Sequence, residues 1–216
     1  MGPPGAGKGT QANLLQQRFG YKHISTGDLL RQNVRDETKL GLAIKKYMDK
    51  AQMAPDELVI QLALDALPSS GGWILDGFPR TLDQAVLLQE KAAPEIVIYI
   101  SPSDEEIMTR IMGRVQCTGG HVYHLTNNPP IKQGICDVDG LELFHRQDDN
   151  SEGLAERLKS YRLFTKPLTD YYRNNSLLWE APDSTIEDVH QAIVQKINAA
   201  NHIAEDEMVS EGGPVF

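Results

Sequence analysis

The sequence has little cysteine, no long apolar run and a deficit of positive charge. Its two cysteines, Cys117 and Cys136, are too few for a disulfide framework and indicate a reducing compartment. No apolar run approaches the length of a membrane span, and no basic segment followed by an apolar one marks a secretory signal. A net charge of −9 argues against general nucleic-acid binding. We therefore expect a cytoplasmic protein with neither membrane nor nucleic-acid partners.

The order of apolar segments indicates an α/β protein. The 216 residues suit one core, with or without inserted lobes. Short apolar segments alternate with amphipathic helical ones, which predicts a parallel sheet. The expected strands are residues 21–24, 73–75, 96–100 and 177–179, and the expected helices include residues 8–19, 28–34, 40–50 and 82–92. The pairs Ser103 with Glu106 and Ser184 with Glu187 predict capping boxes at two further helices.

Two regions depart from this alternation. From Gly113 to Asp149 there is little helical periodicity, and glycine and proline punctuate short β-like pieces such as residues 141–144. We expect a small inserted lobe of antiparallel strands, which in a compact domain is often a lid. After Asn201 the charged residues are all acidic, which predicts a flexible tail over residues 202–216.

The segment Gly2 to Thr10, GPPGAGKGT, carries the strongest functional signal. Its glycines allow successive backbone N–H groups to point into one concavity that holds phosphate oxygens. The helix that follows offers its positive N-terminal end to the same anion, and Lys8 can reach the outer phosphates. The usual pattern has Ser or Thr directly after the lysine, whereas here Gly9 intervenes before Thr10. The alternative is a disordered glycine-rich terminus, which the agreement of Gly, Lys and Thr positions with a following helix disfavours.

Further segments, taken with this loop, make the chain resemble the nucleoside monophosphate kinases and, among them, the adenylate kinase family. The segments are Ile24 to Arg31, Asp76 to Thr81 with Gln84, Gly113-Arg114, Tyr123-His124, Asn128 to Pro130, Arg146 to Asp149, and Arg157-Leu158. They stand in the family's order with near-family spacing. The resemblance covers almost the whole chain except its start and its acidic tail.

This resemblance implies an enzyme that reversibly transfers a phosphoryl group from Mg-ATP to AMP, giving two ADP. The implied fold is an α/β P-loop core, a three-layer parallel sheet, with an inserted helical NMP-binding lobe and a small β lid. The implied ranges are 1–25, 55–112 and 151–201 for the core, 26–54 for the NMP-binding lobe, 113–150 for the lid and 202–216 for the tail. The family's usual state is a monomer, and closure of both lobes would exclude water from the reaction.

The resemblance also assigns site residues. The implied catalytic residues are Lys8, Arg80, Arg114, Arg146 and Arg157. The implied ATP-binding residues are Gly5, Ala6, Gly7, Lys8, Gly9, Thr10, Arg110, Arg114, Val122 and Tyr123. The implied AMP-binding residues are Thr26, Arg31, Gln52, Met53, Ala54, Gly77, Phe78, Pro79, Arg80, Gln84, Arg146 and Arg157. Asp76 would hold Mg²⁺ through water, and the planar forks of arginine suit phosphoryl groups better than lysine.

These assignments have plain alternatives in the residues themselves. Considered alone, each of these arginines would be interpreted as a solvated surface charge. Only its position in a motif favours a role in phosphate binding. We expect Arg162 and Arg173 to be surface charges of this kind. Asp76 could equally be a cap or turn residue, and Gln84 an ordinary residue on a helix surface.

A metal site in the lid is a weaker hypothesis. Some members of the family bind Zn²⁺ there through two cysteine pairs, with aspartate sometimes the last ligand. Cys136 with Asp139 matches the second pair, but the positions of the first pair hold other residues, and a substitute set must use Cys117 and His121. The Cys-x-x-x-His spacing is not the usual tight knuckle. We therefore favour two free cysteines in a hydrogen-bonded lid, with Mg²⁺ as the cofactor and zinc as the alternative.

The resemblance further implies an apolar strand running into Gly2 in the middle of the sheet, and this sequence does not contain it. Either the true start lies upstream, which we favour, or a shorter chain functions less well. Rival functions remain: a kinase that uses GTP as donor or UMP/CMP as acceptor, or a non-catalytic nucleotide-binding protein. Gln84 favours adenine in the acceptor site, because its amide offers both a donor and an acceptor to the base.

Overall fold

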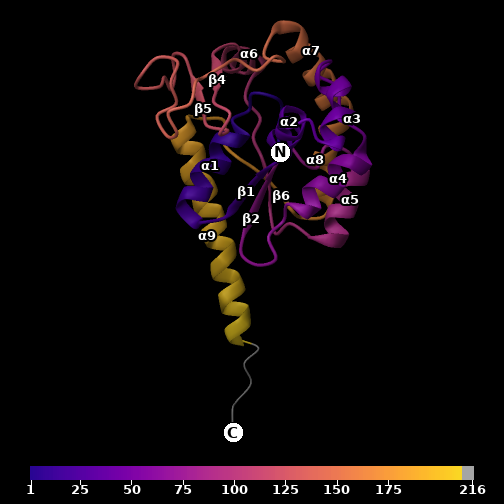
Figure 1. The fold of residues 1–216 in the computed structure, drawn as a ribbon. Coiled ribbons are helices and arrows are strands. Elements are labelled where there is room, and N and C mark those ends of the chain that lie inside the picture. The colour runs from indigo at the N-terminus through magenta and orange to yellow at the C-terminus, as the bar shows by residue number, and fades with distance from the viewer. Residues whose placement is uncertain (211–216) are drawn as a thin grey trace.

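The computed structural model describes residues 1–210 as a chain of alternating helices and short strands (Figure 1). The elements are α1 (Lys8–Phe19), β1 (Lys22–Ser25), α2 (Thr26–Arg35), α3 (Lys39–Met48), α4 (Asp56–Asp65), β2 (Trp73–Asp76), α5 (Leu82–Lys91), β3 (Val97–Tyr99), α6 (Asp104–Met112), β4 (Arg114–Gln116), β5 (Val122–His124), α7 (Ser151–Ser160), η1 (Tyr161–Thr165), α8 (Leu168–Asn174), β6 (Leu178–Glu180) and α9 (Ile186–Ser210). The α/β class expected from the sequence is confirmed.

The strands form three pairs. β1 and β2 are parallel with Lys22 opposite Trp73, and β3 and β6 are parallel with Val97 opposite Leu178. β4 and β5 are antiparallel, and they lie in the region expected to form a small β lobe. Residues 141–144 form no continuous strand, but Glu142 and Phe144 make antiparallel bridges to Ile135 and Gln116. The β-like piece expected over residues 141–144 therefore pairs through single antiparallel bridges, not through a continuous strand.

Helices cover both faces of the parallel pairs. Ile74, Ile98 and Trp179 pack with side chains of α1 and α9 on one face. Val97 and Leu178, their neighbours along the strands, pack with α5 and α8 on the other face. Figure 1 shows β2 and β6 at the centre, with α1 and α9 on one side and α5 and α8 on the other. Strands covered on both faces are apolar at successive positions, which is why their sequences show no alternation.

The first residue extends the pairing of β3. The Met1 amine donates to the Ile98 carbonyl, and the Met1 carbonyl accepts from the Ile100 N–H at 3.0 Å. Bonds on either side of Tyr99 are the pattern of a parallel ladder. No strand within residues 1–210 pairs with both β2 and β3, although both strands border one cavity.

The helix ends agree in part with the expected caps. Ser103 and Glu106 form the reciprocal capping box at α6, as predicted. The second box is wrong by one residue: the Thr185 hydroxyl, not that of Ser184, accepts from a helical N–H, that of Asp188, at 3.2 Å. Residues 202–210 of the expected tail continue α9, and residues 211–216 lie outside the described residues. Over the part of the chain that is described, no helix is both long enough and apolar enough to cross a membrane.

Candidate active site

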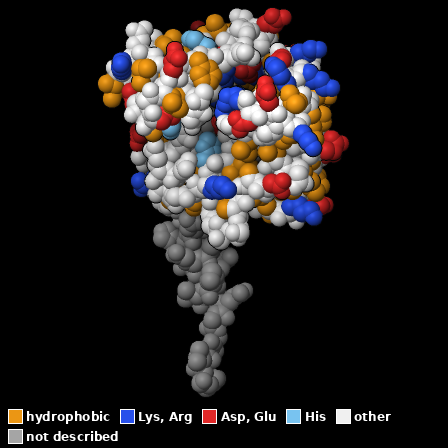
Figure 2. All heavy atoms as spheres, in the orientation of Figure 1, with side chains coloured by type: hydrophobic (Ala, Val, Ile, Leu, Met, Phe, Trp, Pro, Cys, Tyr) orange, Lys and Arg blue, Asp and Glu red, His pale blue; other side chains and the backbone are white. Residues whose placement is uncertain are grey.

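One cavity of about 1500 Å³ contains every residue that the sequence analysis assigned to ATP, AMP or Mg²⁺. It runs from the glycine loop at the start of α1, past the ends of β1 and β2, to the lid and α7. Figure 2 shows its mouth as a hollow with Lys and Arg side chains inside. Residues far apart in the sequence thus line a single cavity. The alternative interpretation, in which each arginine is a solvated surface charge, did not predict this.

The glycine loop forms a tight turn at the base of α1. Ala6 N–H donates to the Pro3 carbonyl at 3.2 Å, and Gly7, in the left-handed region at φ 86°, precedes the helix without a side-chain cap. A Cβ on Gly5 would lie 3.0 Å from the Ile111 side chain of α6, so only glycine fits there easily. The first N–H groups of α1 are therefore open to an anion.

Lys8 lies within this turn. Its Nζ donates to the carbonyls of Gly2 and Pro3 at 2.9 and 2.7 Å. Burial, and then the nearby charges of Arg80, Arg114 and Arg157, lower the pKa of Lys8 to about 8. A bound phosphate would raise the pKa of Lys8, because a nearby anion stabilises the protonated amine.

Two arginines, Arg31 and Arg146, approach the carboxylate of Asp28 in α2. Arg31 donates to Asp28 Oδ1 through Nε at 3.1 Å and through Nη2 at 2.5 Å. Arg146 Nη2 lies 3.9 Å from the same oxygen, and Arg146 Nε donates to Gln116 Oε1 at 2.5 Å. Burial, followed by the charges of Arg114 and Arg31, lowers the pKa of Arg146 to about 9.

A second pair of arginines shares a fully buried carboxylate. Arg114 donates to Asp149 through Nε at 2.7 Å and Nη2 at 2.5 Å, and Arg157 Nη2 donates to the same carboxylate at 2.9 Å. Arg157 also reaches Asp148, at 3.0 Å. The sequence motif contained both aspartates but gave no reason to assign them this anchoring role.

The charge balance of the cavity favours an anionic ligand. Arg80 Nε donates to the Gly77 carbonyl at 2.8 Å, and desolvation with the charges of Arg31 and Arg157 lowers the pKa of Arg80. Cations that depress one another's pKa destabilise the empty site, and phosphate would relieve that repulsion. A cationic cleft within a chain of net charge −9 is therefore a local feature with a ligand-binding function.

Gln84 is buried, not on a helix surface. Its Nε2 donates to Asp56 Oδ1 at 2.8 Å, and its Oε1 accepts from the Arg80 N–H at 2.7 Å. Asp56 also accepts from the Thr81 hydroxyl at 2.5 Å. Asp56 therefore fixes the amide that we expect to meet adenine. The sequence analysis missed Asp56, because it stands in the first turn of α4, where an acidic residue needs no further explanation.

Asp76 ends β2 beside the glycine loop. A Cβ on Gly9 would lie 3.3 Å from Asp76 Oδ2, and His23 Nε2 lies 3.9 Å from the same oxygen. Among residues 1–200, no hydrogen bond to the Asp76 carboxylate is present, so the group is available for a hydrated cation. Arg110 lies over the other side of the loop, its Nη1 donating to the Ala6 carbonyl at 3.5 Å.

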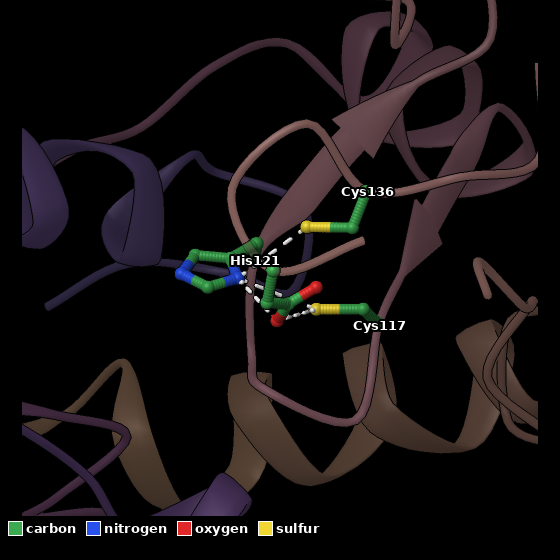
Figure 3. A group of neighbouring side chains, drawn as sticks. Cys117, His121 and Cys136 are labelled. Carbon is green, nitrogen blue, oxygen red and sulfur yellow. Dashed lines mark hydrogen bonds and ion pairs between the residues drawn. The ribbon is translucent and has the colours of Figure 1, made fainter. Parts of the chain in front are cut away.

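The segment from β4 to the loop after β5 brings together the four residues of the substitute metal set. Cys117 and His121 come from the turn between β4 and β5, and Cys136 and Asp139 come from the following loop. Their ligand atoms all lie within 4.8 Å of one another. Figure 3 shows the two thiols and the imidazole directed at a common point. The sequence spacing did not favour this convergence.

Arg162 and Arg173 are exposed, as expected. Arg162 pairs with Asp104 at 3.1 Å, and Arg173 pairs with Asp170 and Glu180 at 2.6 and 2.8 Å. Neither arginine lines the cavity. The arginines assigned from motifs therefore line the cavity, whereas these two surface arginines do not.

The comparison with known proteins agrees with this site. The family model for adenylate kinase matches residues 1–177. An adenylate kinase of Methanothrix thermoacetophila is 46% identical over 187 residues, which cover 82% of this chain and 86% of that relative. Adenylate kinases of Methanosarcina barkeri and Caldicellulosiruptor saccharolyticus are 47% and 46% identical, again over 82% of this chain and over 86% and 87% of their own. This chain belongs to the adenylate kinase family, whose fold is an α/β P-loop fold.

Proposed function

We propose that this chain catalyses the reversible transfer of a phosphoryl group from Mg-ATP to AMP, giving two ADP. One observation carries the proposal: the glycine loop and the five arginines assigned to phosphates line a single cavity. Phosphoryl transfer needs little covalent chemistry from the protein, and it depends on alignment and charge stabilisation. The cavity supplies both without requiring a nucleophilic side chain.

In this mechanism the two nucleotides enter from opposite sides of the arginine cluster. The loop N–H groups and Lys8 hold the donor's outer phosphates, with Arg110 against its base. Arg31 and Arg80 hold the acceptor's phosphate, and Gln84 contacts its adenine. Mg²⁺, held near Asp76 through water, would neutralise phosphate charge when bound.

The remaining arginines act where charge develops. Arg114 and Arg157, oriented by Asp149, place planar N–H forks toward the group in transfer. Arg146 approaches from the lid side and lies 3.9 Å from Asp28 in the helical lobe. We propose that residues 26–54 and 113–150 close over the nucleotides as lobe and lid, which excludes water from the reaction.

The direct test is ADP formation by the purified chain with Mg-ATP and AMP. Turnover with these substrates, together with lower rates when GTP or UMP is offered, supports the proposal. Tight calorimetric binding of an adenosine–polyphosphate–adenosine bisubstrate would show that both nucleotide sites are assembled. Binding without turnover would instead support a non-catalytic nucleotide-binding protein, and preference for GTP would overturn the donor assignment.

Binding of Mg-ATP is expected to weaken about tenfold between pH 7 and pH 9. With a pKa of about 8, Lys8 is mostly protonated at pH 7 and only about one-tenth protonated at pH 9, so restoring its proton on phosphate binding costs about tenfold in affinity over that range. Calorimetric titration at pH 7, 8 and 9 measures the trend. In Lys8→Arg the cation stays charged, so its binding curve should be flat across this range, whatever its absolute affinity. Equal affinities for the unmodified chain at pH 7 and 9 would contradict the role given to Lys8.

Asp56→Asn is expected to raise the KM for AMP about tenfold while leaving the KM for ATP within about twofold. The asparagine amide cannot accept from both Thr81 and Gln84 as the carboxylate does, so the Gln84 amide loses its fixed orientation. Steady-state kinetics with each nucleotide varied in turn separates the two constants. Glu57→Gln, an exposed change in the same turn of α4, is the matched control. A parallel rise in both constants would indicate a general loss of structure.

A further inference from the structure

We propose that Thr165 is a positioning residue for phosphoryl transfer, because its hydroxyl fixes the peptide of Arg80 against the helical segment that carries Arg157. The Thr165 hydroxyl donates to the Arg80 carbonyl at 3.1 Å, and the two residues are 85 positions apart in the chain. Thr165, Arg80 and Arg157 all line the nucleotide cavity. This role rests on the proposed function, in which Arg80 holds the acceptor's phosphate and Arg157 faces the group in transfer.

The hydrogen bond of Thr165 differs from the usual bond of a threonine in a helix. Such a hydroxyl commonly donates to a carbonyl of its own helix, three or four residues earlier. Thr169 of α8 does this, with its hydroxyl 2.7 Å from the Lys166 carbonyl. Thr165 instead donates to the segment between β2 and α5. Its hydroxyl therefore joins two parts of the site that are distant in sequence.

The π turn η1 brings Thr165 to the cavity. α7 carries Arg157 on its cavity side, and an α-helical continuation would repeat that side seven residues later, at Phe164. In η1 the Lys166 N–H instead donates to the Tyr161 carbonyl at 2.8 Å, five residues back, and this wider turn shifts the repeat by one residue. Phe164 is accordingly 45% exposed, whereas Thr165 is 9% exposed and lines the cavity. Single π turns of this kind are frequent at functional sites.

The first residue of η1 is fixed to a strand. Tyr161 begins η1, and its hydroxyl lies 2.7 Å from the hydroxyl of Tyr99, the last residue of β3. η1 therefore connects β3, through its first residue, with the Arg80 carbonyl, through its last. Because η1 also continues α7 directly, a displacement of this turn would move the Arg80 peptide and the end of the Arg157 helix together.

The guanidinium of Arg80 follows its own backbone closely. Its Nε donates to the Gly77 carbonyl at 2.8 Å, and a Cβ on Gly77 would lie 3.2 Å from Arg80 Nη2. Residues 77–81 belong to neither β2 nor α5, and side chains hold the Arg80 peptide on both sides. Gln84 Oε1 accepts from its N–H, and the Thr165 hydroxyl donates to its carbonyl. Removal of the Thr165 hydroxyl leaves that carbonyl without this donor, so the turn that carries the guanidinium is expected to shift.

The first experiment compares Thr165→Val with Thr165→Ser by steady-state kinetics. Valine keeps the volume but not the donor, so kcat/KM for AMP should fall about tenfold while the KM for ATP stays within about twofold. Serine keeps the hydroxyl and should restore most of the rate. Thr169→Val is the matched control, because it removes an equally buried hydroxyl that lies outside the cavity. An unchanged kcat/KM in Thr165→Val, or an equal loss in Thr165→Ser or in the control, overturns the proposal.

The second experiment tests whether Thr165 acts through Arg80, with a measurement that does not depend on turnover. Calorimetric titration with the adenosine–polyphosphate–adenosine bisubstrate compares the unmodified chain, Thr165→Val, Arg80→Ala and the double variant. Thr165→Val should weaken binding about tenfold when Arg80 is present and by less than about twofold when it is absent, because no guanidinium then remains to be positioned. Equal losses in both backgrounds overturn the proposal. Bisubstrate binding without ADP formation would contradict the proposed function instead, and the same four affinities would still decide the role of Thr165.

Discussion

Replacing Asp149 with asparagine is expected to lower the free energy of unfolding by about 3–5 kcal/mol and to cut kcat about 100-fold. The Asp149 side chain is fully buried and accepts three hydrogen bonds, from two nitrogens of Arg114 and one of Arg157. Removing one partner of a buried ion pair leaves uncompensated charge, at a cost of about 3–5 kcal/mol. The arginines are also the proposed stabilisers of the transition state, and a misplacement of about 1 Å there can cost about 100-fold in rate.

The stability effect should depend on pH in a defined direction. Burial tends to raise the pKa of Asp149, but the hydrogen bond from Arg114 and the charges of Arg114, Arg157 and Arg146 outweigh it and leave the pKa below its ordinary value. A carboxyl whose folded pKa is depressed stabilises the fold above its unfolded pKa of about 3.9 and loses that contribution as pH falls through the folded value. The difference between the two chains should therefore be largest near pH 7 and shrink below about pH 4.

The measurement is urea unfolding of both chains at neutral and acid pH, with steady-state kinetics at neutral pH. Asp148→Asn is the matched control, because it removes the same charge from a neighbouring, partly exposed partner of Arg157. We expect that change to cost less than about 1 kcal/mol. If Asp149→Asn unfolds at the same urea concentration and turns over at the same rate, Asp149 does not hold the two arginines.

The sequence predicted most elements because these depend on local patterns, and the residues that its motifs assigned to nucleotides line one cavity. Apolar segments flanked by helical periodicity placed β2 and β3 within a residue or two of their observed ends. Motif position placed Arg31, Arg80 and Arg157 in the cavity when composition alone favoured the surface. Both kinds of signal lie within short stretches of sequence, and folding brings those stretches together.

Contacts between side chains far apart in the sequence could not be predicted from such local patterns. Nothing in a spacing indicates that Asp149 anchors Arg114, 35 residues earlier, or that Asp56 orients Gln84. The misplaced cap has a similar cause: Ser184 with Glu187 and Thr185 with Asp188 fit overlapping patterns, and the sequence alone does not choose between them. The cluster of Cys117, His121, Cys136 and Asp139 was named from the sequence only as an alternative, because the Cys-x-x-x-His spacing differs from the usual tight knuckle.

An apolar strand fused ahead of Met1 is expected to raise the melting temperature by about 10 °C. The backbone of Met1 already pairs with β3 as the end of a parallel strand, and its side chain packs near Val97, Leu168 and Tyr172. The cavity continues from there between the edges of β2 and β3, past Ile74 and other apolar side chains. A chain segment there would find unpaired backbone on both sides and apolar residues from both helical layers.

The size of the effect follows from burial against ordering. Five buried Ile and Val side chains contribute about 1.5–3 kcal/mol each, and fixing each residue costs about 1–2 kcal/mol. A net gain of about 4 kcal/mol, at about 2–4 °C per kcal/mol for a chain of this length, gives a shift of about 10 °C. The strand would also anchor the glycine loop at its first residue, so the affinity for Mg-ATP should rise with the melting temperature.

The design is a five-residue extension of alternating Ile and Val, compared with a Ser and Asn extension of equal length. Burial lowers the pKa of the Met1 amine to about 5, and both extensions replace that amine with an uncharged peptide N–H. Any gain common to both variants therefore comes from the amine, and only the difference between them reports the strand. Differential scanning calorimetry gives that difference directly. Equal melting temperatures would show that the space between β2 and β3 closes when the protein folds, and that no strand binds there.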